Sequence, residues 1–199
     1  MRSTGWVNIV NGQQGIQRKQ GAAVIDNLYL FRPSEGVVLQ ILERQRASAL
    51  SYDMVGASDG EPPEGWDWHS DSVILGTGPQ AWQRSVAALR SWAQFDMSWV
   101  FPVDRAVPLE QGQEFAYVSR HYGIWSVNVC RVVHTIAETK DGVQRFGFAY
   151  GTLETHALRG EELFVLEHDL ETGEVRFVIQ KFSKPAAFLA RMLMPLTRR

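Results

Sequence analysis

The sequence contains a single cysteine, Cys130, so no disulfide can form within the chain. Long apolar runs are also missing, and no stretch approaches the roughly 20 apolar residues that a membrane-spanning helix needs. Asn8 and Asn11 interrupt the first residues, which therefore lack the apolar core of a signal peptide. These features together predict a cytoplasmic protein without a membrane span.

Positive charge is not concentrated in any segment. The chain has 20 Lys and Arg against 22 Asp and Glu, a formal net charge of -2, and no sustained basic run. Surfaces that bind nucleic acid use clustered Lys and Arg to neutralise phosphates, so we expect no nucleic acid partner. The sequence leaves the oligomeric state open.

Metal and cofactor signatures are scarce as well. The 5 histidines do not have metal-ligand spacing, and no second cysteine is present to complete a zinc site. Gly76-Thr77-Gly78 precedes a helical segment but lacks the third glycine of a dinucleotide-binding fingerprint. We therefore expect no metal and no cofactor.

Tryptophan, in contrast, is abundant, with 7 residues. Each indole combines a large apolar body with one N–H group that needs a partner when it is buried. Cavities and interfaces use such side chains, and so does ordinary core packing. Trp66 and Trp125 are our candidates for a cavity lining.

Periodicity divides the chain into an irregular lead-in, residues 1–30, and one domain, residues 31–199. Apolar residues at helical spacing predict a helix over 34–47, and a second helix follows Pro79 to about residue 94. Short strands are expected at 71–75 and 97–101. The intervening segment 52–68 contains Asp-Gly and Pro-Pro and no period, which is typical of a long functional loop.

After Pro108 the period shifts to 2, and Gly-containing turns separate the segments. Five consecutive strands forming an antiparallel meander are predicted at 114–120, 124–138, 143–151, 161–168 and 174–182. An amphipathic helix from about 185 to 196 ends the chain. The order of elements predicts an α+β fold in which this last helix lies on the concave face of a curved sheet and leaves a cavity.

One predicted strand has two very different faces. In the segment RFGFAYGTLETHALRGEELF, residues 145–164, large aromatic residues alternate with small ones. The aromatic positions are Phe146, Phe148 and Tyr150, and the small ones are Gly147, Ala149 and Gly151. A bare strand face leaves room for a packed helix, another backbone or a bound small molecule.

Several ordered motifs resemble one known family. They are YDMVGAS at 52–58, PPEGW at 62–66, NVCRVV at 128–133, the FGFAYGTLETHALRGEE block and FSKPAAFLAR before the last helix. In this order they resemble the bacterial and plant family known as domain of unknown function 1990, over about residues 28–197. The family is similar in layout to the helix-grip superfamily of polyketide cyclases, lipid-transfer domains and the birch-pollen allergen (Bet v 1-like). That resemblance implies an internal apolar cavity, and it implies no catalytic residue.

Candidate catalytic residues are His156, Glu162 and Arg131. His156 lies within seven residues of Glu161 and Glu162, so that a carboxylate could set the imidazole tautomer of a general base. A surface histidine beside solvated glutamates fits the same spacing. Arg131 stands in an apolar strand, where it would either grip a carboxylate ligand or pair with Glu162 or Glu114.

Two hypotheses follow for the function. The first is binding of a small apolar or amphipathic molecule in an aromatic-lined cavity. The second is a cyclase, dehydratase or hydrolase-type enzyme in which Arg131 anchors an acidic substrate and His156 with Glu161 or Glu162 moves a proton. The expected ligand-binding residues are Tyr52, Trp66, Trp125, Asn128, Arg131, Gly147, Phe148, Ala149 and Tyr150.

Overall fold

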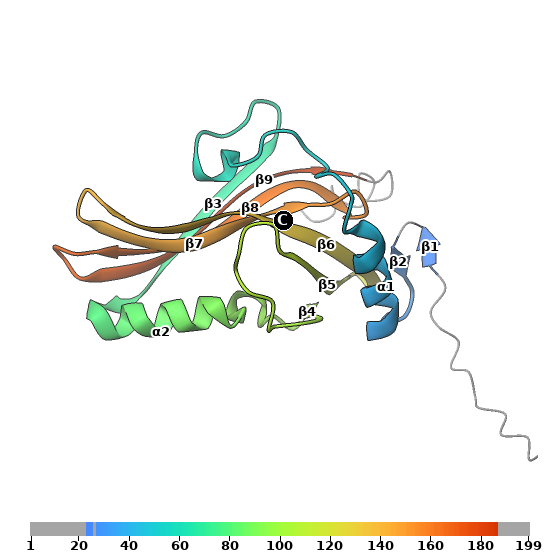
Figure 1. Ribbon diagram of the computed structural model, residues 1–199, viewed down its shortest axis with the longest axis horizontal. Coiled ribbons are helices and arrows are strands. Elements are labelled where there is room, and N and C mark those ends of the chain that lie inside the picture. Colours follow the sequence, from blue (N-terminus) through green and yellow to red (C-terminus); the bar gives the residue numbers. More distant parts are fainter. Residues whose placement is uncertain (1–22, 26, 187–199) are drawn as a thin grey trace, which may run out of the picture.

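The computed structural model describes residues 23–25 and 27–186, which form a curled antiparallel sheet with two α-helices (Figure 1). The strands are β1 (Ala23–Ile25), β2 (Leu28–Tyr29), β3 (Asp67–Thr77), β4 (Val100–Pro102), β5 (Glu114–His121), β6 (Ile124–Lys140), β7 (Val143–Thr152), β8 (Leu158–Asp169) and β9 (Glu174–Pro185). The helices are α1 (Glu35–Gln45), α2 (Gly78–Arg90) and the short 3-10 helices η1 (Ala57–Asp59) and η2 (Ala93–Phe95). The predicted α+β class is confirmed.

Strands β5 to β9 form the predicted meander, because each pairs antiparallel with the next. The turn residues explain why the meander could be predicted from the sequence. Asp141 and Gly142 join β6 to β7 with φ angles of 51° and 78°. Two consecutive positive φ angles are the geometry of a two-residue hairpin that matches the twist of the strands.

Strand β6 is long enough to pair with three other strands. Its first half pairs with β5 on one edge and with β2 on the other, and its second half pairs with β7. Tyr29 of β2 is buried in the core. Residues 28 and 29 of the predicted lead-in therefore contribute to the sheet.

Strand β3 lies far from its sequence neighbours in the sheet order. It covers the predicted segment 71–75 but runs from Asp67 to Thr77 and pairs antiparallel with β9. Helix α2 starts directly afterwards, with Pro79 in its first turn. Proline has no backbone N–H, and it is well suited to this position because an N–H in the first turn of a helix has no partner within the helix.

The two faces of the sheet carry different cores. Helix α2 and η2 pack on one face, here called the α2 face, and α1 and the loop with η1 pack on the opposite α1 face (Figure 1). The α2 face carries an aromatic cluster in which neighbouring ring centroids lie 4.6–6.5 Å apart. Its members are Trp92, Phe95, Phe115, Tyr117, Phe148, Tyr150 and Phe164.

The end of β9 differs from the expectation. A helix was predicted to begin near residue 185, with the strand ending at 182, but Lys184 and Pro185 still pair with Arg159 and Leu158 of β8. Most of the predicted last helix lies outside the described residues. Within the described part of the chain, no helix is long and apolar enough to cross a membrane.

Candidate functional site

A small pocket of about 70 Å³ lies at one end of the aromatic cluster, and we call it the inner pocket. It is large enough for a few water molecules or for one polar group of a ligand. The lining side chains come from β5, β7, β8, β9 and the β7–β8 connection. They include Tyr117, Tyr150, Thr152, His156, Leu158, Glu162, Lys181 and Ser183.

Four of these side chains form two hydrogen-bonded pairs. His156 Nε2 lies 3.0 Å from Tyr117 Oη, and Tyr150 donates to Glu162 Oε2. The two pairs therefore bring an imidazole and a carboxylate to the same pocket wall.

The backbone sets the tautomer of His156. The Leu158 amide N–H donates to Nδ1 over 2.9 Å, so Nδ1 is an acceptor even though Leu158 O lies 3.0 Å from the same atom. A neutral ring then carries its proton on Nε2 and donates it to Tyr117. Burial lowers the pKa of His156 from 6.5 to about 4, which keeps the ring neutral at pH 7.

Burial also affects the two tyrosines. It raises the pKa of Tyr117 and of Tyr150 well above the ordinary value of 10, and the nearby Glu162 carboxylate raises both further. Both hydroxyls therefore stay protonated and act as hydrogen-bond donors. On the neighbouring strand Lys181 stands directly opposite Glu162, so that charges of both signs border the pocket.

Glu161 has a different environment from Glu162, because adjacent residues of a strand point to opposite faces. Its side-chain carboxylate accepts hydrogen bonds from the Tyr52 hydroxyl at 2.6 Å, Gly56 N at 2.9 Å, Ser58 N at 3.1 Å and Ser58 Oγ at 2.5 Å. These donors all belong to the loop before β3. Glu161 therefore anchors this loop, and the structure does not bring its carboxylate to His156.

Arg131 lies on the α1 face and pairs with Glu114, which stands opposite it on β5. Its Nε donates to Glu114 Oε1 over 3.0 Å, and its Nη2 also donates to Ser48 O over 3.0 Å. Carbonyl groups just after a helix need such donors, so Arg131 holds the end of α1 against the sheet. It does not line the inner pocket.

The small residues of β7 lie close to other atoms. A Cβ on Gly147 would lie 2.3 Å from Phe164 O, and one on Gly151 would lie 2.2 Å from Tyr52 Oη. Ala149 is fully buried in a cluster with Leu163. The small residues of β7 are therefore explained by close packing: the backbone of β8 lies against Gly147, and the Tyr52 side chain lies against Gly151.

The remaining predicted ligand-binding residues are spread over the fold. Trp66 packs against Phe182 and Phe148 is fully buried in the aromatic cluster. Asn128 Nδ2 donates to Ser119 Oγ over 3.0 Å, and Trp125 is partly buried beside Phe101. Of the predicted set, His156, Glu162, Glu161 and Tyr150 border the inner pocket.

Sequence reasoning missed Tyr117, Thr152 and Lys181. Tyr117 alternates with Phe115 on the inward face of β5, and that period-2 pattern was the available signal. Lys181 is brought beside Glu162 only by the register of β8 and β9. Within residues 23–25 and 27–186, no group of three or more His, Cys, Asp or Glu side chains is arranged to hold a metal ion.

The fold and the pocket define an α+β protein with a curled antiparallel sheet and a buried aromatic cluster. A family model, domain of unknown function DUF1990, matches residues 51–199, and the chain belongs to this family. It is 35% identical over 185 residues to a UPF0548 protein of Deinococcus radiodurans, covering 85% of this chain and 89% of the relative. It is 29% identical over 189 residues to a UPF0548 protein of Dictyostelium discoideum, with 86% and 88% covered.

A solved structure, that of a hypothetical protein from Helicobacter pylori, is also similar. It is 16% identical and has a TM-score of 0.40, over 73% of this chain and 82% of the other.

Proposed function

We propose that the protein binds a small amphipathic molecule, whose polar head occupies the inner pocket and whose apolar body lies against the aromatic cluster. The observation that supports this proposal is the convergence of His156, Tyr117, Tyr150 and Glu162 on one pocket. A closely packed sheet has no need for four polar groups beside its aromatic core, since each of them costs free energy to bury. A helix-grip arrangement, with residues 187–196 closing the sheet, is part of this proposal.

The chemistry of the lining indicates the type of head group. Glu162 accepts hydrogen bonds and Lys181 donates them, so the pocket has charges of opposite sign on adjacent strands. A neutral hydroxyl or carbonyl group uses both without leaving a buried charge unpaired. The expected ligand therefore combines a neutral polar head with an aromatic or aliphatic body.

The first experiment is native mass spectrometry of the purified protein, in which a co-purified ligand is seen as added mass. The second is a fluorescence titration with naphthol, which has one hydroxyl and an aromatic body. Ser183→Leu, which places an apolar side chain in the inner pocket, should abolish binding of the co-purified ligand and of naphthol. Ser72→Leu on the exposed part of β3 is the matched control and should bind as the unmodified protein does.

Two outcomes would contradict the proposal. If the unmodified protein has no added mass and does not bind naphthol, it does not use the inner pocket for this ligand class. Equal binding by Ser183→Leu and Ser72→Leu would likewise place the ligand elsewhere. Thermal melting of both variants checks that the fold is intact.

The two hydrogen-bonded pairs favour one alternative, acid–base catalysis of the cyclase, dehydratase or hydrolase type. The Glu162 carboxylate, to which Tyr150 donates, is able to take a proton from a substrate and return it to the product, while the neutral His156 is hydrogen-bonded to Tyr117 on the same pocket wall. In this reaction Glu162 is the base and Arg131 is not the anchor, because it is engaged with Glu114. An enzyme would lose turnover in Tyr150→Phe while keeping its affinity for the ligand, whereas a binding protein would have no turnover to lose.

A further inference from the structure

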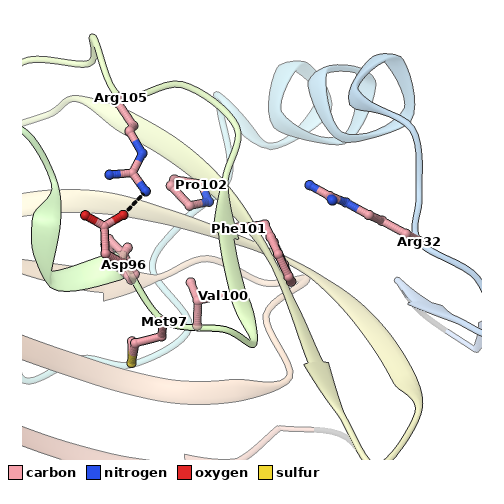
Figure 2. Close-up of a pocket in the computed structure, with 8 residues that line it drawn as sticks. Arg32, Asp96, Met97, Val100, Phe101, Pro102 and Arg105 are labelled. Atoms are coloured by element: carbon pink, nitrogen blue, oxygen red, sulfur yellow. Dashed lines mark hydrogen bonds and ion pairs between the residues drawn. The ribbon is translucent and has the colours of Figure 1, made fainter.

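A second pocket of about 400 Å³ opens on the surface, and we call it the outer pocket (Figure 2). Its volume falls in the range of about 300 to 1,000 Å³ that is usual for small-molecule sites. It is lined by Arg32, Phe95, Asp96, Met97, Val100, Phe101, Pro102 and Arg105. Phe95 also packs against Tyr117 and Tyr150 of the inner pocket, with ring centroids 5.3 Å and 6.2 Å away.

The two arginines of the outer pocket differ in their partners. Arg105 forms an ion pair with Asp96, which Figure 2 shows as a dashed line. Arg32 has no carboxylate partner among the described residues. Its guanidinium carbon lies 4.4 Å from the ring centroid of Phe101 and 5.8 Å from that of Trp125.

Stacking on aromatic rings holds a guanidinium in place and leaves its N–H groups available at the edge. Arg32 is exposed and comes from the segment between β2 and α1, while Phe101 comes from β4. The tertiary structure therefore places a positive charge, which no carboxylate of the described residues pairs with, over the aromatic side of an open pocket. Arg105 adds no free charge, because Asp96 neutralises it.

The rest of the pocket is apolar. Met97 is 38% exposed, Val100 is buried, and Phe101 and Pro102 are partly exposed. A guanidinium beside such a surface fits a ligand with an acidic group and an apolar body. Arginine pairs with carboxylate, sulfonate and phosphate oxygens through two parallel N–H groups, which gives such contacts both strength and direction.

We infer that the outer pocket is a binding site for an amphipathic anion, in which Arg32 pairs with the acidic group and the apolar body lies on Met97, Phe101 and Pro102. This site does not depend on the proposed function of the inner pocket. Its ligand is anionic, whereas the inner pocket is expected to take a neutral head group. The acidic group can belong to a free acid or to a lipid within a bilayer.

The test compares two fluorescent probes that differ in one group. Anilinonaphthalene sulfonate is anionic, and N-phenylnaphthylamine has the same aromatic body without the sulfonate. Arg32→Gln should weaken binding of the sulfonate by about tenfold or more, because a charge-assisted hydrogen bond is lost. Binding of N-phenylnaphthylamine should change by less than about twofold, since the apolar surface remains.

Arg120→Gln is the matched control. Arg120 also stacks on Trp125, at 5.4 Å, but it does not line the outer pocket. This variant should bind the sulfonate as the unmodified protein does. Equal weakening by Arg32→Gln and Arg120→Gln would mean a general charge effect and would overturn the inference, as would a lack of sulfonate binding in the unmodified protein.

Ser183→Leu separates this result from the proposal for the inner pocket. If it abolishes sulfonate binding while Arg32→Gln does not, the probe occupies the inner pocket and the inference for the outer pocket fails. Two further measurements identify the source of the anion. Displacement of the probe by monomeric decanoate indicates a free acid. Sedimentation of the protein with phosphatidylcholine vesicles only when they contain phosphatidylglycerol indicates a lipid. Arg32→Gln should weaken whichever of the two interactions is observed.

Discussion

The Tyr52 hydroxyl donates a hydrogen bond of 2.6 Å to Glu161, across 109 positions of the sequence. Gly56 and Ser58 donate to the same carboxylate, so the loop segment YDMVGAS is held on strand β8. Two motifs that resemble the family therefore meet at one buried side chain. This relationship explains both motifs as parts of a structural anchor on the α1 face.

Tyr52→Phe should destabilise the protein, because it leaves the buried Glu161 carboxylate with one donor fewer. A hydrogen bond to a charged group contributes about 1.5–3 kcal/mol, and we expect a loss of this size in urea denaturation. Glu161→Gln should cost at least as much, since its amide NH₂ would face the donors of the loop. The exposed Glu154 provides a control, and Glu154→Gln should stay within about 0.5 kcal/mol of the unmodified protein.

Stability should decrease in acid through the titration of His156. Its pKa is about 4 in the folded protein, below the ordinary 6.5, so between these values the unfolded chain binds the additional proton. The contribution is therefore fully present above pH 6.5 and is lost as the pH falls towards 4. Each pKa unit corresponds to about 1.4 kcal/mol, which makes this loss on the order of 3 kcal/mol.

Urea denaturation at about pH 7.5 and about pH 4.5 measures this effect. His156→Gln should lose less stability between the two pH values than the unmodified protein does. His69→Gln, at an exposed position on β3, should follow the unmodified protein. If His156→Gln has the same pH dependence as the unmodified protein, the acid sensitivity comes from other groups.

The ion pair of Arg131 and Glu114 should make a moderate contribution to the free energy of unfolding. The two side chains are 24% and 12% exposed, so Arg131→Met should cost about 1–3 kcal/mol rather than the larger loss expected for a fully buried pair. Glu114→Gln should cost less, because Arg131 would keep its hydrogen bonds to Arg46 O and Ser48 O.

A double-mutant cycle with urea denaturation compares the stability losses of Arg131→Met, Glu114→Gln and the double variant. The double variant should be more stable than the sum of the two single losses predicts, since no uncompensated carboxylate remains. It should nevertheless stay less stable than Glu114→Gln alone, because the end of α1 has lost its donor. Strict additivity of the two losses would show that the pair is not coupled.

Gly160→Ala should be strongly destabilising. Gly160 has a φ angle of 143°, and a Cβ there would lie 2.0 Å from Phe182 O. We expect a loss of more than about 3 kcal/mol, because backbone atoms of both β8 and β9 would have to move. Gly36→Ala in the first turn of α1 is the comparison, since a Cβ there would have no atom within 4 Å and alanine favours a helix by about 0.5–1 kcal/mol. Thermal melting should lower the midpoint in the first variant and leave or raise it in the second.

Much of the secondary structure could be predicted from local patterns. Hairpins depend on residues next to each other, and the Asp141-Gly142 turn with alternating residues on both sides indicates β6 and β7 directly. Helix α2 was indicated in the same way by Pro79 and by its apolar stripe. The meander of β5 to β9 follows because every one of its connections is short.

Pairings between distant segments could not be predicted in this way. The sequence contains nothing that assigns β3 to the free edge of β9, since an exposed edge strand has no regular burial pattern. The short β2 was missed because two residues are too few to show a period. Its partner on β6 lies about a hundred positions further along the chain.

The sequence by itself determined the α+β class, the meander and the likeness to one family, because these follow from short-range periodicity and from motifs. Only the tertiary structure decided which polar groups meet. Glu161 and Glu162 are adjacent in sequence, yet the alternation of the strand sends one to the loop anchor and the other to the inner pocket. Tyr117 reaches His156, and Arg32 reaches Phe101, through strand register and loop packing. These contacts depend on interactions between distant segments, which no local pattern encodes.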